Sequence, residues 1–302
     1  MKIQKKNLKK NIFYLCLIIL PVTQFLIMYV YVNLNSFLMP FRDFNVLENK
    51  WEWAGFTNFE ALFYDIKTLP ELRYGFKNSL VFFAITFIFG ISLSLLLSYY
   101  IYKKRFGAGF FRVLLFLPSI ISSLVLAVIF RYYADTFLPT LLNRVFKADL
   151  VGFLSNAKTI MPTLMIFSVY CSFGVNVILY VGAMSAIPES IIEAADIDGA
   201  GQFRQFISIV LPQIVPTIEI FVTTTIAGIF VNQINLYSFY RSSLPYDELS
   251  NIGYYIYKVV AEATSNAAYP KISALGVIIT LVISPIVIGT RYLFRKFNPM
   301  ND

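Results

Sequence analysis

Six segments of the chain carry no charged side chain, and shorter polar segments separate them. The six segments, which together make up nearly half of the 302 residues, are 11–41, 80–101, 113–130, 159–188, 220–240 and 272–290. A helix needs about 20 mostly apolar residues to cross the hydrocarbon core of a bilayer. The pattern therefore predicts an all-α integral membrane protein with six transmembrane helices, over about 12–34, 80–101, 113–130, 159–184, 214–236 and 272–290.

The composition agrees with this class. Charged residues form 14% of the chain and hydrophobic residues 58%, whereas soluble domains carry about 25% charged residues. Lysines precede the first apolar segment, as in a signal peptide, but no small-residue cleavage site follows it, so we expect a retained helix. The polar segment 42–79 contains Trp51 and Trp53, and tryptophan favours the membrane–water boundary. We expect a short helix along the outer membrane surface in this segment.

Basic residues gather in short segments at three places: before the first span, after the second and after the last. Short loops rich in Lys and Arg stay on the cytoplasmic side of a membrane. We therefore expect both termini in the cytoplasm, as tails over 1–11 and 294–302 that flank a transmembrane domain over 12–293. The net charge of +8 then reflects membrane topology, and no nucleic-acid partner is expected. The clusters are Lys2, Lys5, Lys6, Lys9 and Lys10; Lys103, Lys104, Arg105 and Arg112; and Arg291, Arg295 and Lys296.

The residue types that are missing exclude several kinds of chemistry. The chain has no histidine, and its two cysteines, Cys16 and Cys171, lie inside apolar segments. These facts argue against Cys/His zinc sites, histidine-based catalytic triads and a disulfide framework. No GxxxxGK[ST] phosphate-binding loop occurs. We therefore expect a non-catalytic chain without a cofactor of its own.

The connection over 188–212 is the most informative polar segment. Pro188 suits the first turn of a helix, and Glu189 and Glu193 complement the positive end of the helix dipole. Gly199 then offers a left-handed helix stop. The segment holds four acids and one base, which reverses the charge of the other predicted cytoplasmic segments. Either the acids are merely solvated, or a protein partner meets them; the anionic inner leaflet would repel an acidic helix, so we favour the partner.

A second short helix is expected after Gly199. Its apolar residues recur with helical spacing and predict one buried stripe, after which Leu211-Pro212 would end the helix and return the chain to the bilayer. The stripe consists of Phe203, Phe206, Ile207 and Val210.

In this segment the chain resembles the permease subunits of binding-protein-dependent ABC importers. Their signature reads Glu-Ala-Ala, three residues, Gly, nine residues, Ile, one residue, Leu-Pro. The segment 188–212 is called the EAA loop below. The matching residues are Glu193, Ala194, Ala195, Gly199, Ile209, Leu211 and Pro212, and Asp198, Gly199 and Ala200 form the Asp-Gly-Ala common in sugar-transporting members.

The likeness extends over most of the chain and is closest to the maltose and glycerol-phosphate type. One departure lies after the fifth span, where that group often has a Gly-Gly-Pro turn and this chain reads YRSSLP over 240–245, so this loop carries no substrate inference. The matching elements elsewhere are GFTNF over 55–59, Asn78-Ser79, the RxxxxxP element from Arg112 to Pro118, Leu142-Asn143, and Ile187-Pro188.

The resemblance implies the six-helix fold of a type I importer permease in the bacterial cytoplasmic membrane. It implies a second permease subunit, as a heterodimer, and two copies of an ABC ATPase that bind ATP and Mg²⁺. It also implies an extracytoplasmic solute-binding protein that delivers a sugar. The EAA loop would be the coupling helix, with Glu193 contacting a basic side chain of the ATPase and Gly199 forming the turn.

Polar residues at membrane depth are candidates for the translocation path. Asn232, Gln233 and Asn235 lie close together in the fifth predicted span, Asn176 lies in the fourth, and Tyr237 could stack on a sugar ring. The alternative is that they join helices to one another or to the second permease.

Two other transporter classes and one enzyme class are alternatives to a sugar-transporting ABC permease. An ABC permease for amino acids or peptides is the nearest alternative. An ion-coupled secondary transporter should show buried carboxylates and paired interrupted repeats, and the one marginal acid is Glu219, for which we favour a structural or partner-facing role. A membrane enzyme would need a catalytic constellation that the sequence does not show.

Overall fold

The computed structural model describes residues 2–297, and nearly all of its regular structure is helical. The chain forms two compact units, one of residues up to 64 with 263–278 and the other of 65–262 with 279–297. Five helical segments are long and apolar enough to cross a membrane, and a bent helix pair raises the number to six. The five are Phe13–Phe41, Pro70–Tyr102, Ser123–Phe146, Ala157–Ser185 and Asn266–Lys296.

The first unit begins with one long helix and continues into a hairpin. α1 (Lys2–Gln24) runs through a π-helical turn into α2 (Val32–Leu38) without leaving helical geometry, so it starts earlier than the expected residue 12. The antiparallel strands β1 (Arg42–Asn45) and β2 (Lys50–Trp53) follow it.

The hairpin carries both tryptophans and packs on an aromatic cluster. The Phe41 ring stacks on Trp53 with centroids 5.9 Å apart and meets Phe59 at 5.3 Å. Asn58, from the GFTNF element, donates to the carbonyl oxygens of Pro40 and Arg42 at 3.1 and 2.9 Å. The expected short helix of this region is α3 (Thr57–Thr68).

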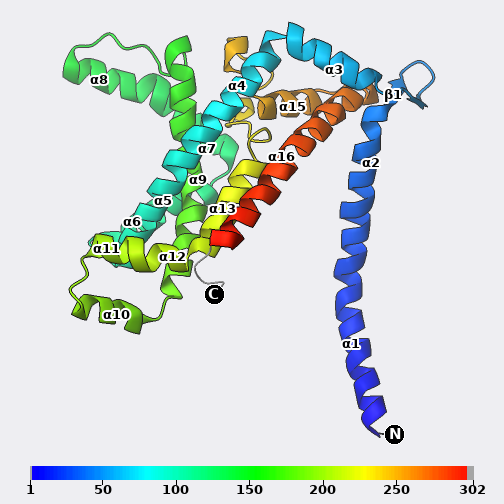
Figure 1. The fold of residues 1–302 in the computed structure, drawn as a ribbon. Helices are drawn as coiled ribbons and strands as arrows, with labels where there is room; N and C mark the ends of the chain where they lie inside the picture. The colour runs from blue at the N-terminus through cyan, green and yellow to red at the C-terminus, as the bar shows by residue number, and fades with distance from the viewer. Residues whose placement is uncertain (1, 298–302) are drawn as a thin grey trace. The chain divides into compact units, whose positions relative to one another are not determined.

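In the second unit, α9 (Ala157–Ser185) packs against α5 (Ile91–Tyr102) and α6 (Ala108–Ile120), as Figure 1 shows. α4 (Pro70–Ile85) joins α5 through a π-helical turn to form one continuous span. α7 (Ser123–Tyr132) continues into α8 (Leu138–Phe146). α15 (Ile252–Ala261) lies against α4. α16 (Tyr269–Phe297) is the last helix of the described residues.

Two predicted spans differ from the observed helices. The span predicted over 113–130 is interrupted, because Ile121 and Ser122 have extended backbone angles between α6 and α7. Pro118 lies just before the break and lacks the amide hydrogen that would continue the helix. The span predicted over 214–236 is helical only as α13 (Val215–Ala227), and residues 228–235 form turns instead.

Candidate functional site

The first half of the EAA loop is a helix that ends in a tight reversal. Pro188 stands at the N-cap of α10 (Glu189–Ile197). Gly199 has φ +74°, and its amide donates to the Asp196 carbonyl oxygen at 3.1 Å while the Ala200 amide donates to that of Ala195 at 2.9 Å. This pair of hydrogen bonds is the Schellman motif, whose left-handed position favours glycine because a Cβ would be strained there. The predicted turn at Gly199 is confirmed.

One face of α10 is exposed and acidic. Glu193 and Ala194 are exposed, and the side chain of Ile197 is 87% exposed. Asp198, in the turn, is exposed as well. The opposite face is anchored, because Ile192 and Ala195 are buried. The loop therefore presents carboxylates together with an exposed apolar side chain.

The second half of the loop buries a different face from the predicted stripe. In the helix formed by α11 (Gln202–Gln205), a π-helical turn over Phe206–Val210, and α12 (Leu211–Gln213), Phe206 and Val210 are buried. Phe203 and Ile207 are 76% and 44% exposed, so half of the predicted stripe is wrong. The buried face contains Gln205 together with Phe206 and Val210, so a polar side chain takes a buried position that the apolar pattern did not indicate.

The last residues of the signature, Ile209, Leu211 and Pro212, lie before the point where the helix bends. Ile209 and Leu211 are half-buried against the cluster that contains Tyr180, Phe206 and Val210. Pro212 lies inside α12, and the helix axis bends by 73° only at the junction with α13, where Ile214 leaves helical geometry. The expected break at Leu211-Pro212 therefore falls two residues later.

Gln205 joins the two halves of the loop, a role that the sequence pattern did not indicate. Its side chain is almost completely buried. Its Nε2 donates to Asp196 Oδ1 at 2.5 Å and to the Ala200 carbonyl oxygen at 2.8 Å, and its Oε1 accepts from Lys103 Nζ at 2.8 Å. Because Lys103 caps the end of α5, this one amide also ties the EAA loop to the α5–α6 turn.

A second contact strengthens the link between α5 and the loop. The Tyr99 hydroxyl donates to the Gln202 carbonyl oxygen at 3.0 Å, and the Tyr99 ring lies 4.8 Å from the ring of Phe206. Tyr99 therefore anchors the EAA loop to α5 through both a hydrogen bond and a ring contact.

The three amide residues of the expected fifth span lie on a turn. Asn232, Gln233 and Asn235 follow the end of α13, and Asn235 has a left-handed φ of +56° at the start of α14 (Leu236–Tyr240). The prediction that a helix carries them is therefore wrong. Unwound backbone at membrane depth occurs where protein or a cavity covers it.

Residues 251–253 pack closely against this turn. A Cβ at Gly253 would lie 2.5 Å from the carbonyl carbon and oxygen of Asn232, so only glycine fits there. Asn251 Nδ2 donates to the Asn232 carbonyl oxygen at 2.7 Å, and Asn232 Oδ1 accepts from the Ile234 amide at 2.8 Å. The polar groups of Asn232 thus serve the turn itself.

The other path candidates lie on this turn and on the helices α9 and α14. Asn235 Nδ2 lies 3.4 Å from Ser168 Oγ on α9, and the Gln233 Oε1 atom is buried without a hydrogen-bond partner among the described residues. Asn176 is half-buried on α9. The Tyr237 ring packs edge-on against Tyr257 of α15 with centroids 4.7 Å apart.

Motif residues of α4 and α8 hold neighbouring loops by hydrogen bonds. Asn78 Nδ2 donates to the carbonyl oxygens of Glu248 and Ser250, each at 2.7 Å, and Ser79 Oγ accepts from the Ile252 amide at 3.2 Å. Asn143 exchanges two hydrogen bonds with the backbone of residue 150, at 3.0 and 2.8 Å. An asparagine side chain suits this use because it offers both a donor and an acceptor.

α15 is held to α4 by buried polar groups. Lys258 Nζ lies 3.1 Å from Glu71 Oε1, with both side chains mostly buried. The Tyr254 hydroxyl donates to the Arg241 carbonyl oxygen at 2.8 Å. Burial, with the nearby Asp65 and Glu71 carboxylates, raises the pKa of Tyr255 to about 12, so this phenol is neutral at physiological pH.

Glu219 has a partner within its own unit. Its Oε1 lies 3.7 Å from Arg291 Nε on α16, and the two side chains are 19% and 59% exposed. This ion pair supports the structural role favoured for Glu219.

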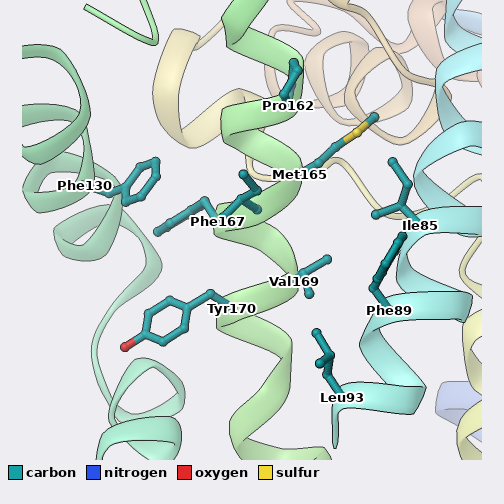
Figure 2. A pocket seen from close by; sticks show the side chains of 10 residues that line it. Ile85, Phe89, Leu93, Phe130, Pro162, Met165, Phe167, Val169 and Tyr170 are labelled. Atoms are coloured by element: carbon teal, nitrogen blue, oxygen red, sulfur yellow. The ribbon is translucent and has the colours of Figure 1, made fainter. Parts of the chain in front are cut away.

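A cavity of about 700 Å³ opens between α7, α9 and the α4–α5 span. Figure 2 shows Ile85, Phe89 and Leu93 facing Met165 and Val169 of α9 across it. Its lining is almost entirely apolar, so it lacks the hydrogen-bonding groups that would orient a polar solute.

Comparison with known proteins identifies the family to which this chain belongs. Residues 87–300 match the model of the binding-protein-dependent transport system inner membrane component. The probable starch degradation products transport system permease protein AmyD of Thermoanaerobacterium thermosulfurigenes is 27% identical, covering 97% of this chain and 98% of its own length. The arabinooligosaccharides transport system permease protein AraP of Bacillus subtilis is 26% identical, covering 87% of this chain and 82% of its own length.

A solved structure shares the fold. A chain of a bacterial alginate ABC transporter, crystallised in complex with an alginate pentasaccharide-bound periplasmic protein, is 22% identical and superposes with a TM-score of 0.77 over 97% of this chain and 98% of that chain. The EAA loop, the apolar helices and the family match together show that the chain is a multi-pass membrane protein that belongs to the family of binding-protein-dependent transport system inner membrane components.

Proposed function

We propose that this chain is a permease subunit of an ATP-driven importer and forms half of the translocation path for a sugar or oligosaccharide. The observation that carries the proposal is the EAA loop, an exposed acidic helix that Gln205 fastens to a transmembrane helix. The names of AmyD and AraP, which describe transport of starch degradation products and arabinooligosaccharides, support a carbohydrate as solute.

The exposed face of α10 is the proposed docking surface for an ATPase, present in two copies that bind ATP and Mg²⁺. Glu193 would pair with a basic side chain of the ATPase, and Ile197, 87% exposed, would fill an apolar depression beside it. This arrangement resembles a typical protein interface, in which a polar rim surrounds an apolar centre.

The same contacts suggest how ATP-driven motion reaches the membrane. When the ATPases close, α10 would move with them. Gln205 and Tyr99 would pass the movement to α5, and the 73° bend before α13 would carry it into the fifth span. The helices would then alternate between inward-facing and outward-facing arrangements.

The same link supports the orientation that we propose in the bacterial cytoplasmic membrane. The Lys103–Gln205 hydrogen bond places the basic α5–α6 turn and the EAA loop on one side, and Lys-rich turns favour the cytoplasmic side. The loops fastened by Asn78 and Asn143 would then face outward, where a solute-binding protein docks. A second, different permease subunit would complete the path.

The proposal is tested by purifying the complex in mild detergent and reconstituting it with its binding protein. We expect a P-loop ATPase and a second six-helix subunit to co-purify, and we expect an oligosaccharide to stimulate ATP hydrolysis. Glu193→Lys should abolish ATPase co-purification but leave membrane insertion intact. Glu60→Lys, which reverses an exposed acid on α3, is the matched control and should change neither.

Three results would contradict the proposal. Stimulation by amino acids or peptides and not by any sugar would overturn the solute class. Equal ATPase recovery from the Glu193 and Glu60 variants would overturn the docking surface. A stable, isolated chain that moves solute under an ion gradient would overturn the ATP-driven class.

A further inference from the structure

A second cavity, which unlike the first has a polar lining, lies at the turn between α5 and α6. Its volume is about 350 Å³, and its charged lining consists of Lys104, Arg105 and Arg112. The other lining residues are Ile101, Gly107, Ala108 and Gly109, so none of the seven is acidic. Three cations around one hollow create a local positive potential that attracts an anion.

Glu189 lines a neighbouring cavity together with Lys104, but in the described part of the chain no carboxylate lies within ion-pair distance of the three cations. The N-cap position of α6 is Gly107, which offers no side-chain cap, so the positive end of the helix dipole also faces this turn. Bringing like charges together costs free energy, and a bound anion would offset that cost.

The turn is folded tightly enough to hold the three cations in place. Lys104 has a left-handed φ of +50°, and its amide donates to the Ile101 carbonyl oxygen at 3.0 Å. The Tyr100 hydroxyl donates to the Phe106 carbonyl oxygen across the turn. A non-glycine residue keeps a left-handed conformation only where its surroundings enforce it.

Exposed aromatic side chains flank the cationic cavity. Phe106 at the tip of the turn is 96% exposed, and Phe110 in the first turn of α6 is 68% exposed. These residues stand at the ends of two apolar helices, where aromatic rings and basic side chains meet the headgroup layer of a bilayer. A soluble anion would leave these rings exposed to water, whereas the acyl chains of a lipid would cover them.

From this geometry we propose that the α5–α6 turn is a binding site for the phosphate group of an anionic phospholipid. Lys104, Arg105 and Arg112 hold the phosphate, and Phe106 and Phe110 contact the glycerol and upper acyl region. Basic pockets at the ends of transmembrane helices recognise anionic headgroups in this way. Which leaflet supplies the lipid depends on the orientation in the proposed function, but the binding itself does not.

The test uses the complete transporter complex in detergent, with native mass spectrometry to count bound lipids during titration with phosphatidylglycerol or phosphatidylcholine. The wild type should retain phosphatidylglycerol in preference to phosphatidylcholine. The triple variant Lys104→Gln, Arg105→Gln and Arg112→Gln should bind phosphatidylglycerol about a hundredfold more weakly, because each basic residue near the surface contributes roughly fivefold.

The matched control removes three exposed bases from another region. The variant Arg144→Gln, Lys147→Gln and Lys158→Gln has the same change in net charge and should bind phosphatidylglycerol like the wild type. If the first triple variant does not fold, Arg105→Gln alone replaces it, with an expected loss of about fivefold.

Two outcomes would overturn the proposal. The first is equal phosphatidylglycerol affinity in the wild type and the α5–α6 variants. The second is competition in which inorganic phosphate at millimolar concentration displaces phosphatidylglycerol and gives the same thermal stabilisation, which would assign the cavity to a free anion. Neither outcome affects the sugar-transport assay, so failure here is distinguishable from failure of the proposed function.

Discussion

Replacing Gln205 with leucine should loosen the EAA loop without unfolding the protein. Leucine keeps a side chain of similar size in a buried position, but it removes the hydrogen bonds to Asp196, Ala200 and Lys103. The change therefore isolates the polar part of the contact from its packing.

The size of the effect follows from the three bonds. A hydrogen bond to a charged group contributes about 1.5–3 kcal/mol and a neutral one about 0.5–1.5 kcal/mol, so two of the former and one of the latter give a gross loss of about 3.5–7.5 kcal/mol. Asp196 is exposed and Lys103 is half-exposed, so water replaces much of what they lose. A net loss of about 2 kcal/mol remains, which is about a 30-fold increase in the open population of the loop.

Hydrogen exchange of the purified complex measures this opening. The amides of Gly199 and Ala200 close the turn with hydrogen bonds, so they should exchange about 30-fold faster in Gln205→Leu, since local opening limits their exchange. Gln202→Leu is the matched control, because that side chain lies one helical turn away and is exposed. Exchange within about threefold of the wild type, or equal acceleration in the control, would refute the reasoning.

Three further predictions concern other contacts. Gly253→Ala places a Cβ 2.5 Å from the Asn232 carbonyl and should destabilise the protein by about 3 kcal/mol or more; an unchanged melting temperature would contradict the close approach. Lys258→Met leaves Glu71 partly buried without its cation and should cost about 1–2 kcal/mol in thermal unfolding, whereas Lys50→Met, at an exposed pair, should cost nearly nothing. Glu219→Gln should leave uptake and its pH dependence unchanged, because the carboxylate pairs with an exposed arginine; joint loss of both would indicate proton coupling.

Features that depend on local chemistry were predictable from the sequence. Charge-free segments of sufficient length located four of the six predicted membrane spans, because desolvating a charge is far costlier than losing helix propensity. Gly199 marked the turn of the EAA loop, since only glycine adopts φ +74° there without strain. The spacing of the signature was likewise enough to suggest the family, which the match over residues 87–300 shows.

Which polar side chains hydrogen-bond distant segments together, and where the helices end, depends on tertiary contacts. Gln205 meets Lys103 from 102 residues away, and Asn78 meets Ser250 from 172 residues away, so no local pattern encodes either pair. The unwound segment 228–235 is apolar enough to read as helix, yet the close approach of Gly253 and the side chain of Asn251 stabilise a turn there. Apolar spacing reports that a segment is buried, whereas its backbone path depends on which distant groups satisfy its amides and carbonyls.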